Sequence, residues 1–200
     1  MNARAITPPT DEQVGHLLDA CKPNTTGQRN RALVALLRYA GLRVTEAIAL
    51  EPRDLRTVRA PGGHEYTEVH VRRGKGGKPR HVAMLAGGEV ELRRWLEARA
   101  ALDLPASARL FCVCNGKRAG APLTRAYIDA MLKRLAYDAG FPSAQRIHAH
   151  ALRHAFATSM HHDGRKLVTI QQQLGHAHAI TTERYLAGLT AHGVAADLFG

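Results

Sequence analysis

The sequence predicts a mainly α-helical fold with a small antiparallel three-stranded sheet. Apolar residues recur at helical spacing through most of the chain, and they alternate with polar residues only between about positions 55 and 85. The 200 residues contain no internal repeat, low-complexity tract or long linker. We therefore expect a single domain spanning residues 1–200.

Three helices are expected in the N-terminal part, at about 10–20, 26–40 and 44–50. Thr10 and Gln13 have the spacing of a capping box, which marks a helix N-terminus. Gly41 is a natural C-terminal stop for the second helix, and Pro52 closes the third.

The alternating region is typical of short strands. Thr67, Val69 and Val71 fall on one face of a strand, and Val82 lies in a later run. Glycines stand where the turns are expected, at 62–63 and 74–77.

Helices return in the second half, at about 89–101, 124–139, 149–162 and 167–174, with a last turn or two at 179–186. Thr124 is the expected N-cap of its helix, while Gly140 and Gly175 are the expected stops.

The charge balance points to a polyanionic partner. The chain carries 28 Lys and Arg against 17 Asp and Glu, a net charge of +11 with a pI near 10.2. No apolar run is long enough to span a bilayer, and no signal core or lipidation motif is present. We therefore expect a polyanionic partner, no membrane, and a cytoplasmic location.

Six residues stand out as candidates for catalysis: Arg43, Lys75, His150, Arg153, His176 and Tyr185. Arg43 follows a Gly-Leu pair at a helix junction, and Lys75 lies in a glycine-rich turn. His150 and Arg153 are three apart on one expected helix, so they share a face.

These residue types suit the transfer of a DNA phosphodiester to a tyrosine. Two arginines can stabilise a pentavalent phosphorus, and a tyrosine hydroxyl can attack it and hold it covalently. Histidines and a lysine can move the protons. Because the phosphotyrosine link conserves the bond energy, the reaction needs no ATP, metal or other cofactor.

Four segments resemble the signature boxes of the tyrosine recombinase (phage integrase) family: 40–46 (Ala-Gly-Leu-Arg-Val-Thr-Glu), 74–78 (Gly-Lys-Gly-Gly-Lys), 150–154 (His-Ala-Leu-Arg-His) and 174–176 (Leu-Gly-His). They occur in the family's order, and Tyr185 follows His176 by nine residues. The match runs from about residue 8 to residue 185, and the combination is far more specific than any single box.

The resemblance implies the catalytic-domain fold of that family and a role for each candidate. Phosphate contacts would come from Arg43, Arg153 and His176. Lys75 would be the general acid for the 5′ oxygen, and His150 would exchange a proton near Tyr185. Tyr185 would form a 3′-phosphotyrosine and leave a free 5′ hydroxyl, as in a site-specific recombinase.

The resemblance also bears on domains and assembly. Members usually carry an N-terminal core-binding domain, so the chain corresponds to a short form without it or to a fragment. In the family the C-terminal region often packs on the adjacent protomer. Val194, Leu198 and Phe199 could form an apolar stripe that packs on its own domain or on a neighbour. We expect a homo-oligomer, from dimer to tetramer, on paired DNA sites.

Alternatives remain open on the residues alone. Residues 167–186 resemble a helix-turn-helix, which would suit a non-catalytic DNA-binding regulator. A type IB topoisomerase would share most of the chemistry. His150 and His154 have a spacing that can bind zinc, but the segment between them lacks the glutamate of a metalloprotease helix.

Several candidates also have simpler explanations. Arg43 could be a capping arginine paired with Glu46, and Lys78 is a rival for the role of Lys75. The other tyrosines are expected to be packing residues: Tyr39, Tyr66, Tyr127 and Tyr137. The three cysteines are expected to be buried thiols: Cys21, Cys112 and Cys114.

Overall fold

The computed structural model describes residues 8–72, 78–142 and 147–175. Its longer helices are α1 (Asp11–Asp19), α2 (Thr25–Tyr39), α4 (Glu89–Ala100), α5 (Arg125–Asp138) and α6 (Ala149–His162). The shorter ones are α3 (Val44–Ala49) and α7 (Leu167–Leu174), with 3-10 turns η1 (Pro52–Asp54), η3 (Ala86–Gly88) and η4 (Gly116–Arg118). The strands are β1 (Leu55–Arg59), β2 (Glu65–Val71) and β3 (Arg80–Ala83).

The mainly helical fold with a small three-stranded sheet is confirmed. Each expected helix up to residue 174 is present with both ends within one residue of the expected bounds. The expected turn at 179–186 lies outside the described residues, as do the glycines at 74–77. The Thr10 capping box forms as predicted, with the Gln13 amide donating to Thr10 Oγ1 over 3.2 Å.

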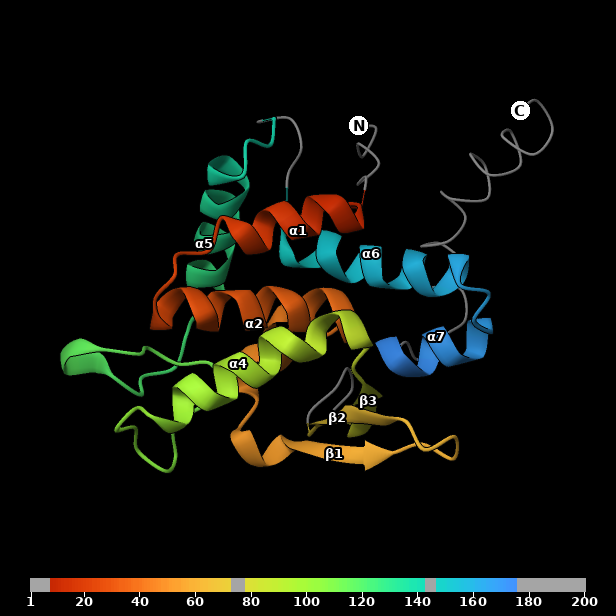
Figure 1. Cartoon of the computed structure of the whole chain (residues 1–200), viewed down its shortest axis with the longest axis horizontal. Coiled ribbons are helices and arrows are strands. Elements are labelled where there is room, and N and C mark those ends of the chain that lie inside the picture. The colour runs from red at the N-terminus through yellow and green to blue at the C-terminus, as the bar shows by residue number, and fades with distance from the viewer. Residues whose placement is uncertain (1–7, 73–77, 143–146, 176–200) are drawn as a thin grey trace.

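Helix α2 is the centre of the domain. Residues 32–37 of this helix are completely buried, because α1 and α6 cover one side and α4 covers the other (Figure 1). A helical stretch that is apolar on every side, as residues 32–37 are, must be enclosed in this way.

The sheet is a simple antiparallel meander in the order β1-β2-β3. Val69 and Val82 are cross-strand partners, and both are buried on the face toward the helices. Glu68 lies on the opposite face and pairs with Arg56 of β1. The alternation seen in the sequence therefore corresponds to an inner and an outer face.

The expectation that Tyr137 is a packing residue is wrong, because Tyr137 is 82% exposed. Tyr127 is 40% exposed, and its ring packs against the guanidinium of Arg29. Helix α5 buries Ile128, Leu132 and Leu135 instead, which lie on a different face of the helix. All three cysteines are buried free thiols, as expected, and burial raises the pKa of Cys21 to about 11.

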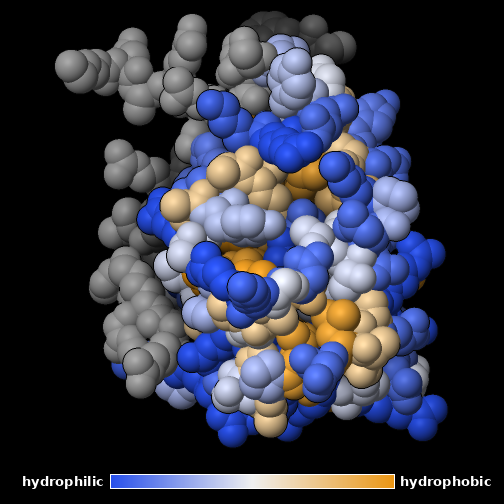
Figure 2. Space-filling view, turned by 90° about the vertical axis from the view of Figure 1, so that its left-hand side faces the viewer, coloured by the Kyte–Doolittle hydropathy of each residue, from blue (hydrophilic) through white to orange (hydrophobic). Residues whose placement is uncertain are grey.

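Hydrophilic side chains cover much of the surface. Figure 2 shows a largely hydrophilic face in which apolar areas are separated by hydrophilic side chains. Within the described residues, no helix combines the length and apolar character needed to cross a membrane.

Candidate active site

The Gly41–Arg43 junction between α2 and α3 positions the first arginine. Gly41 has φ +62°, and a Cβ there would lie 2.4 Å from the ring of Phe156, so only glycine fits. Arg43 is the N-cap of α3, and its backbone N–H donates to Glu46 Oε2 over 2.9 Å. The capping interaction therefore places Glu46 directly beside Arg43.

Glu46 is the buried centre of an arginine cluster, which we define as Arg43, Arg80 and Arg153. Its side chain is only 3% exposed, and its two oxygens accept from Arg80 Nη1 and Nη2 over 2.8 and 2.9 Å. Arg43 Nη1 donates to Glu46 Oε1 over 2.8 Å, and Arg153 Nη1 lies 4.0 Å from Oε2. One carboxylate thus lies beside three arginines, which come from the N-cap of α3, from β3 and from α6.

The charge state of Glu46 follows from these partners. Burial alone would raise the pKa of its carboxyl group. The hydrogen bonds from Arg80 and Arg43 outweigh burial and lower that pKa to about 2. Glu46 is therefore ionised at neutral pH, and its single negative charge lies among the three arginine charges of the cluster.

The same arginines also bind the C-terminal end of α7. Arg80 Nε donates to Gln173 O over 3.2 Å and Arg153 Nη2 to Leu174 O over 2.5 Å, while Arg43 Nη2 lies 3.4 Å from Gly175 O. These carbonyls have no partner inside the helix and carry its partial negative charge. The cluster therefore fixes the point at which the chain leaves α7.

Gly175 completes this junction. It ends α7 in the left-handed conformation, with φ +62°, and a Cβ there would lie 2.9 Å from the guanidinium carbon of Arg80. A glycine is thus needed both for the backbone and for the close approach of the arginine.

A cavity of about 280 Å³ opens beside the cluster. Its lining includes Arg43 and Arg153, together with His148 and His150 at the start of α6. Arg43 is 28% exposed, whereas Arg153 is 3% exposed, with Nη1 donating to Gly41 O. The cavity is therefore an open, positively charged recess of a size that suits a phosphate group.

Two histidines line this cavity. His148 Nδ1 accepts the backbone N–H of Ala151 over 3.1 Å, so its side chain caps α6. Partial burial lowers the pKa of His150, and the nearby His148, Arg153 and Arg43 lower it further. A neutral imidazole can accept a proton at neutral pH.

The structure brings together three of the six candidate residues: Arg43, His150 and Arg153. The other three lie outside the described residues: Lys75, His176 and Tyr185. Within 8–72, 78–142 and 147–175, no three His, Cys, Asp or Glu side chains are grouped so that they could hold a metal ion.

Glu46 and Arg80 were not identified from sequence as members of the site. The sequence indicates Glu46 only as a partner of Arg43. A signal for Arg80 exists, because it lies two residues before the buried Val82 and so points to the inner face of the sheet. An arginine on the inner face of a strand requires a buried acceptor.

The chain matches one protein family over most of its length. Residues 10–192 match the model of the phage integrase family. The tyrosine recombinase XerC of Chromobacterium violaceum is 35% identical over 161 residues, which cover 80% of this chain and 48% of that protein. The chain thus spans about half the length of the curated relatives it matches.

Solved structures agree on the fold. XerH site-specific recombinase bound to its difH substrate, in a pre-cleavage complex, superposes with a TM-score of 0.70 and 30% identity, over 90% of this chain and 49% of that one. The catalytic domain of bacteriophage HP1 integrase superposes with a TM-score of 0.57 over 98% of this chain and 95% of that domain. Its identity of 20% makes this second likeness one of fold alone.

Proposed function

Because the chain belongs to the phage integrase family, we propose that it is the catalytic domain of a site-specific recombinase that cuts and rejoins double-stranded DNA. The observation that carries the proposal is the arginine cluster around Glu46 beside an open cavity. Its excess of two positive charges matches the charge of a pentavalent phosphorane, which carries one negative charge more than the phosphodiester.

Cleavage then proceeds by transesterification. The Tyr185 hydroxyl attacks the scissile phosphorus, so a bond from Oη to phosphorus forms while the bond from phosphorus to the 5′ oxygen breaks. The tyrosine proton passes toward His150, and Lys75 gives a proton to the departing 5′ oxygen. Rejoining is the reverse reaction, with a 5′ hydroxyl as nucleophile. The proposed reaction therefore consumes no ATP, and none of its steps uses a metal ion.

Arginines of the cluster contribute to holding the phosphate itself. Arg43 is more exposed than Arg153. We assign these two arginines to the two non-bridging oxygens of the phosphate. His176 is a further hydrogen-bond donor to the phosphate. Glu46 keeps Arg43 oriented and prevents the three arginines from repelling one another.

The proposed partners are double-stranded DNA and further copies of the same chain. The solved XerH structure contains its DNA substrate, and the basic charge of this chain suits the same kind of ligand. Recombination joins two duplexes, so we propose that protomers assemble as dimers and tetramers on paired sites.

A covalent trap tests the proposal. The protein first selects its binding sequence from a random duplex pool, and nicks are then tiled across the selected duplex. Cleavage near a nick releases a short fragment, so the protein stays attached to DNA and migrates slowly in a denaturing gel. Failure to trap any adduct on a duplex that the protein binds would contradict the proposal, whereas relaxation of supercoils without strand exchange would indicate a topoisomerase.

A further inference from the structure

The side chain that caps α6 is a histidine, and it lines the cavity beside the arginine cluster. His148 Nδ1 accepts the backbone N–H of Ala151 over 3.1 Å. The same position is held by Thr10 in α1, Asn24 in α2 and Thr124 in α5, all of which are preferred N-cap residues. Histidine is not among the preferred types. Capping alone therefore does not explain why a histidine stands at this position.

The cap also fixes the imidazole ring of His148. Because Nδ1 accepts the backbone N–H, Nε2 is the ring nitrogen that can donate a hydrogen bond. The ring is nearly parallel to that of His150, with 6.2 Å between the ring centroids and 18° between the planes. Both residues line the cavity of about 280 Å³ that Arg43 and Arg153 also line. A hydrogen-bond donor is thus held in place at this cavity before any ligand binds.

The charges around the cavity suit an anion. Among the described residues, its lining includes three arginines, Arg43, Arg125 and Arg153, and one carboxylate, Asp129. The carboxylate lies 3.6 Å from Arg125, which offsets its charge. The N-terminus of α6 adds partial positive charge. A phosphate group in this cavity would therefore meet more positive than negative charge.

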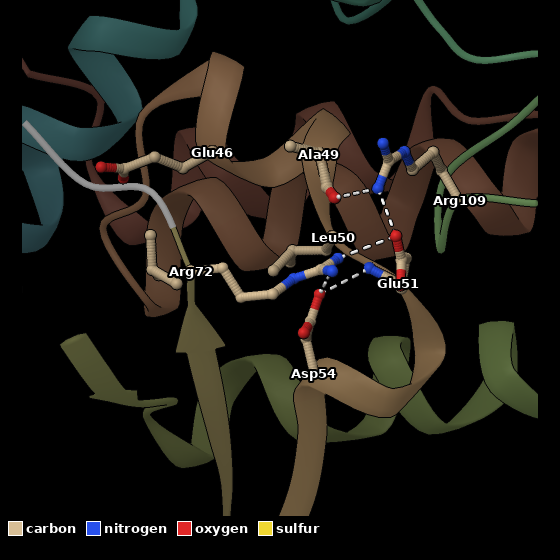
Figure 3. Close-up of a pocket in the computed structure, with 8 residues that line it drawn as sticks. Glu46, Ala49, Leu50, Glu51, Asp54, Arg72 and Arg109 are labelled. Atoms are coloured by element: carbon tan, nitrogen blue, oxygen red, sulfur yellow. Dashed lines mark hydrogen bonds and ion pairs between the residues drawn. The ribbon is translucent and has the colours of Figure 1, made fainter. Parts of the chain in front are cut away.

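The pocket in Figure 3 gives a contrast. Its volume is about 400 Å³, and its described lining holds three carboxylates, Glu46, Glu51 and Asp54, and two arginines, Arg72 and Arg109. Arg72 Nη2 lies 2.9 Å from Glu51 Oε1, and Arg109 binds the same oxygen (Figure 3). Its arginines are thus already paired with carboxylates, which would repel a phosphate. Of the two pockets, the one at the start of α6 is the better phosphate site.

We propose that His148 is a further catalytic residue, which donates a hydrogen bond from Nε2 to the scissile phosphate. This inference rests on the proposed function, which places that phosphate beside Arg43 and Arg153. The bond strengthens as charge builds up on the non-bridging oxygens in the transition state. Because the cap already holds the ring, binding of the phosphate does not have to order it. The competing explanation is that His148 caps α6 and does nothing else.

Two substitutions separate the contact from the cap. His148→Ser removes the imidazole but keeps an oxygen that can accept the Ala151 N–H, since serine is a preferred N-cap. His148→Ala removes both the imidazole and the cap. Each variant should cleave the nicked duplex of the covalent trap about 10- to 100-fold more slowly in a single turnover, as for one lost hydrogen bond to a charged group. Only His148→Ala should unfold at a lower urea concentration than the unaltered protein.

His161→Ser is the matched control. His161 lies in the last turn of α6 and is exposed, so this variant removes an imidazole from the same helix at the end away from the cavity. It should cleave at nearly the normal rate. His148→Thr provides a second capping variant, and it should be as slow as His148→Ser. If His148→Ser is unfolded by circular dichroism, the comparison is made with His148→Thr.

Sulfur at the scissile phosphate tests the contact itself. One non-bridging oxygen is replaced by sulfur, which accepts hydrogen bonds poorly, and the two stereoisomers are cleaved separately. A donor that binds one oxygen loses its acceptor in one isomer only. The rate ratio of unaltered protein to His148→Ser should therefore fall to about 2-fold on one isomer and keep its full value on the other, as in a double-mutant cycle. An equal ratio on both isomers would overturn the direct contact.

The outcomes separate this inference from the proposed function. If the unaltered protein forms no covalent adduct on a duplex that it binds, the proposed function fails, and the inference fails with it. If the adduct forms and His148→Ser cleaves at the normal rate, the proposed function stands and the inference is wrong. In that case His148 serves only as the cap of α6.

Discussion

Glu46→Gln gives the most quantitative test of the arginine cluster. In the folded protein the pKa of Glu46 is about 2, against an ordinary value of 4.5. Each unit of pKa corresponds to about 1.4 kcal/mol, so ionised Glu46 contributes roughly 3 kcal/mol to the free energy of unfolding. The side chain is 3% exposed, so little of this is lost to solvent screening.

The pH dependence has a defined sign. The pKa is depressed in the folded state, so the stabilisation is fully present above the unfolded value of 4.5 and is lost as pH falls through the folded value of about 2. Glutamine resembles the protonated carboxyl group. The stability difference between the unaltered protein and Glu46→Gln should therefore be largest near neutral pH and should shrink by roughly 3 kcal/mol toward pH 2.

Urea unfolding at several pH values measures this difference. Glu68→Gln is a suitable control, because Glu68 pairs with Arg56, whose side chain is 65% exposed, and the change should cost less than about 1 kcal/mol. A Glu46→Gln deficit that does not change between pH 7 and pH 3 would refute the assignment of an ionised, arginine-held carboxylate. A deficit no larger than that of Glu68→Gln would refute it as well.

Arg43→Ala and Arg153→Ala should each slow single-turnover cleavage by about 10²-fold or more, because each removes charge that stabilises the phosphorane. A near-normal rate would remove that arginine from the site. Cleavage should continue in excess chelator, since no step of the proposed reaction uses a metal ion; loss of cleavage with rescue by Mg²⁺ or Zn²⁺ would contradict the mechanism. Deleting residues 191–200 should weaken loading of a second protomer on DNA more than loading of the first, seen as lost slower bands in gel-shift titrations. An insoluble or unfolded truncated protein would instead assign this tail to its own core.

Local signals were sufficient to predict the helices. The bounds of α6 and α7 match the expected ranges, and Gly41 and Gly175 stand where a left-handed residue is required. The irregular stretch between α4 and α5 has no comparable signal. Its bridge from Cys112 to Pro122 joins residues ten apart through backbone contacts that side-chain patterns do not encode.

Only those site residues could be predicted whose types and order along the sequence indicate the chemistry. Arg43, His150 and Arg153 were identified in this way, and they line one cavity. The central role of Glu46 depends on Arg80, which is 34 residues away, and on the burial that makes their pairing necessary. Such a contact arises from tertiary packing, so a sequence pattern indicates at most that an arginine on the inner face of a strand needs a partner.

The measurement that bears most directly on the proposed function is the identity of the residue linked to DNA. The trapped adduct is digested with protease and nuclease, and the modified peptide is sequenced by mass spectrometry. We expect a nucleotide joined through its 3′ phosphate to Tyr185, and we expect Tyr185→Phe to bind the same duplex without forming the adduct. A link to any other residue, or an adduct that persists in Tyr185→Phe, would contradict the account.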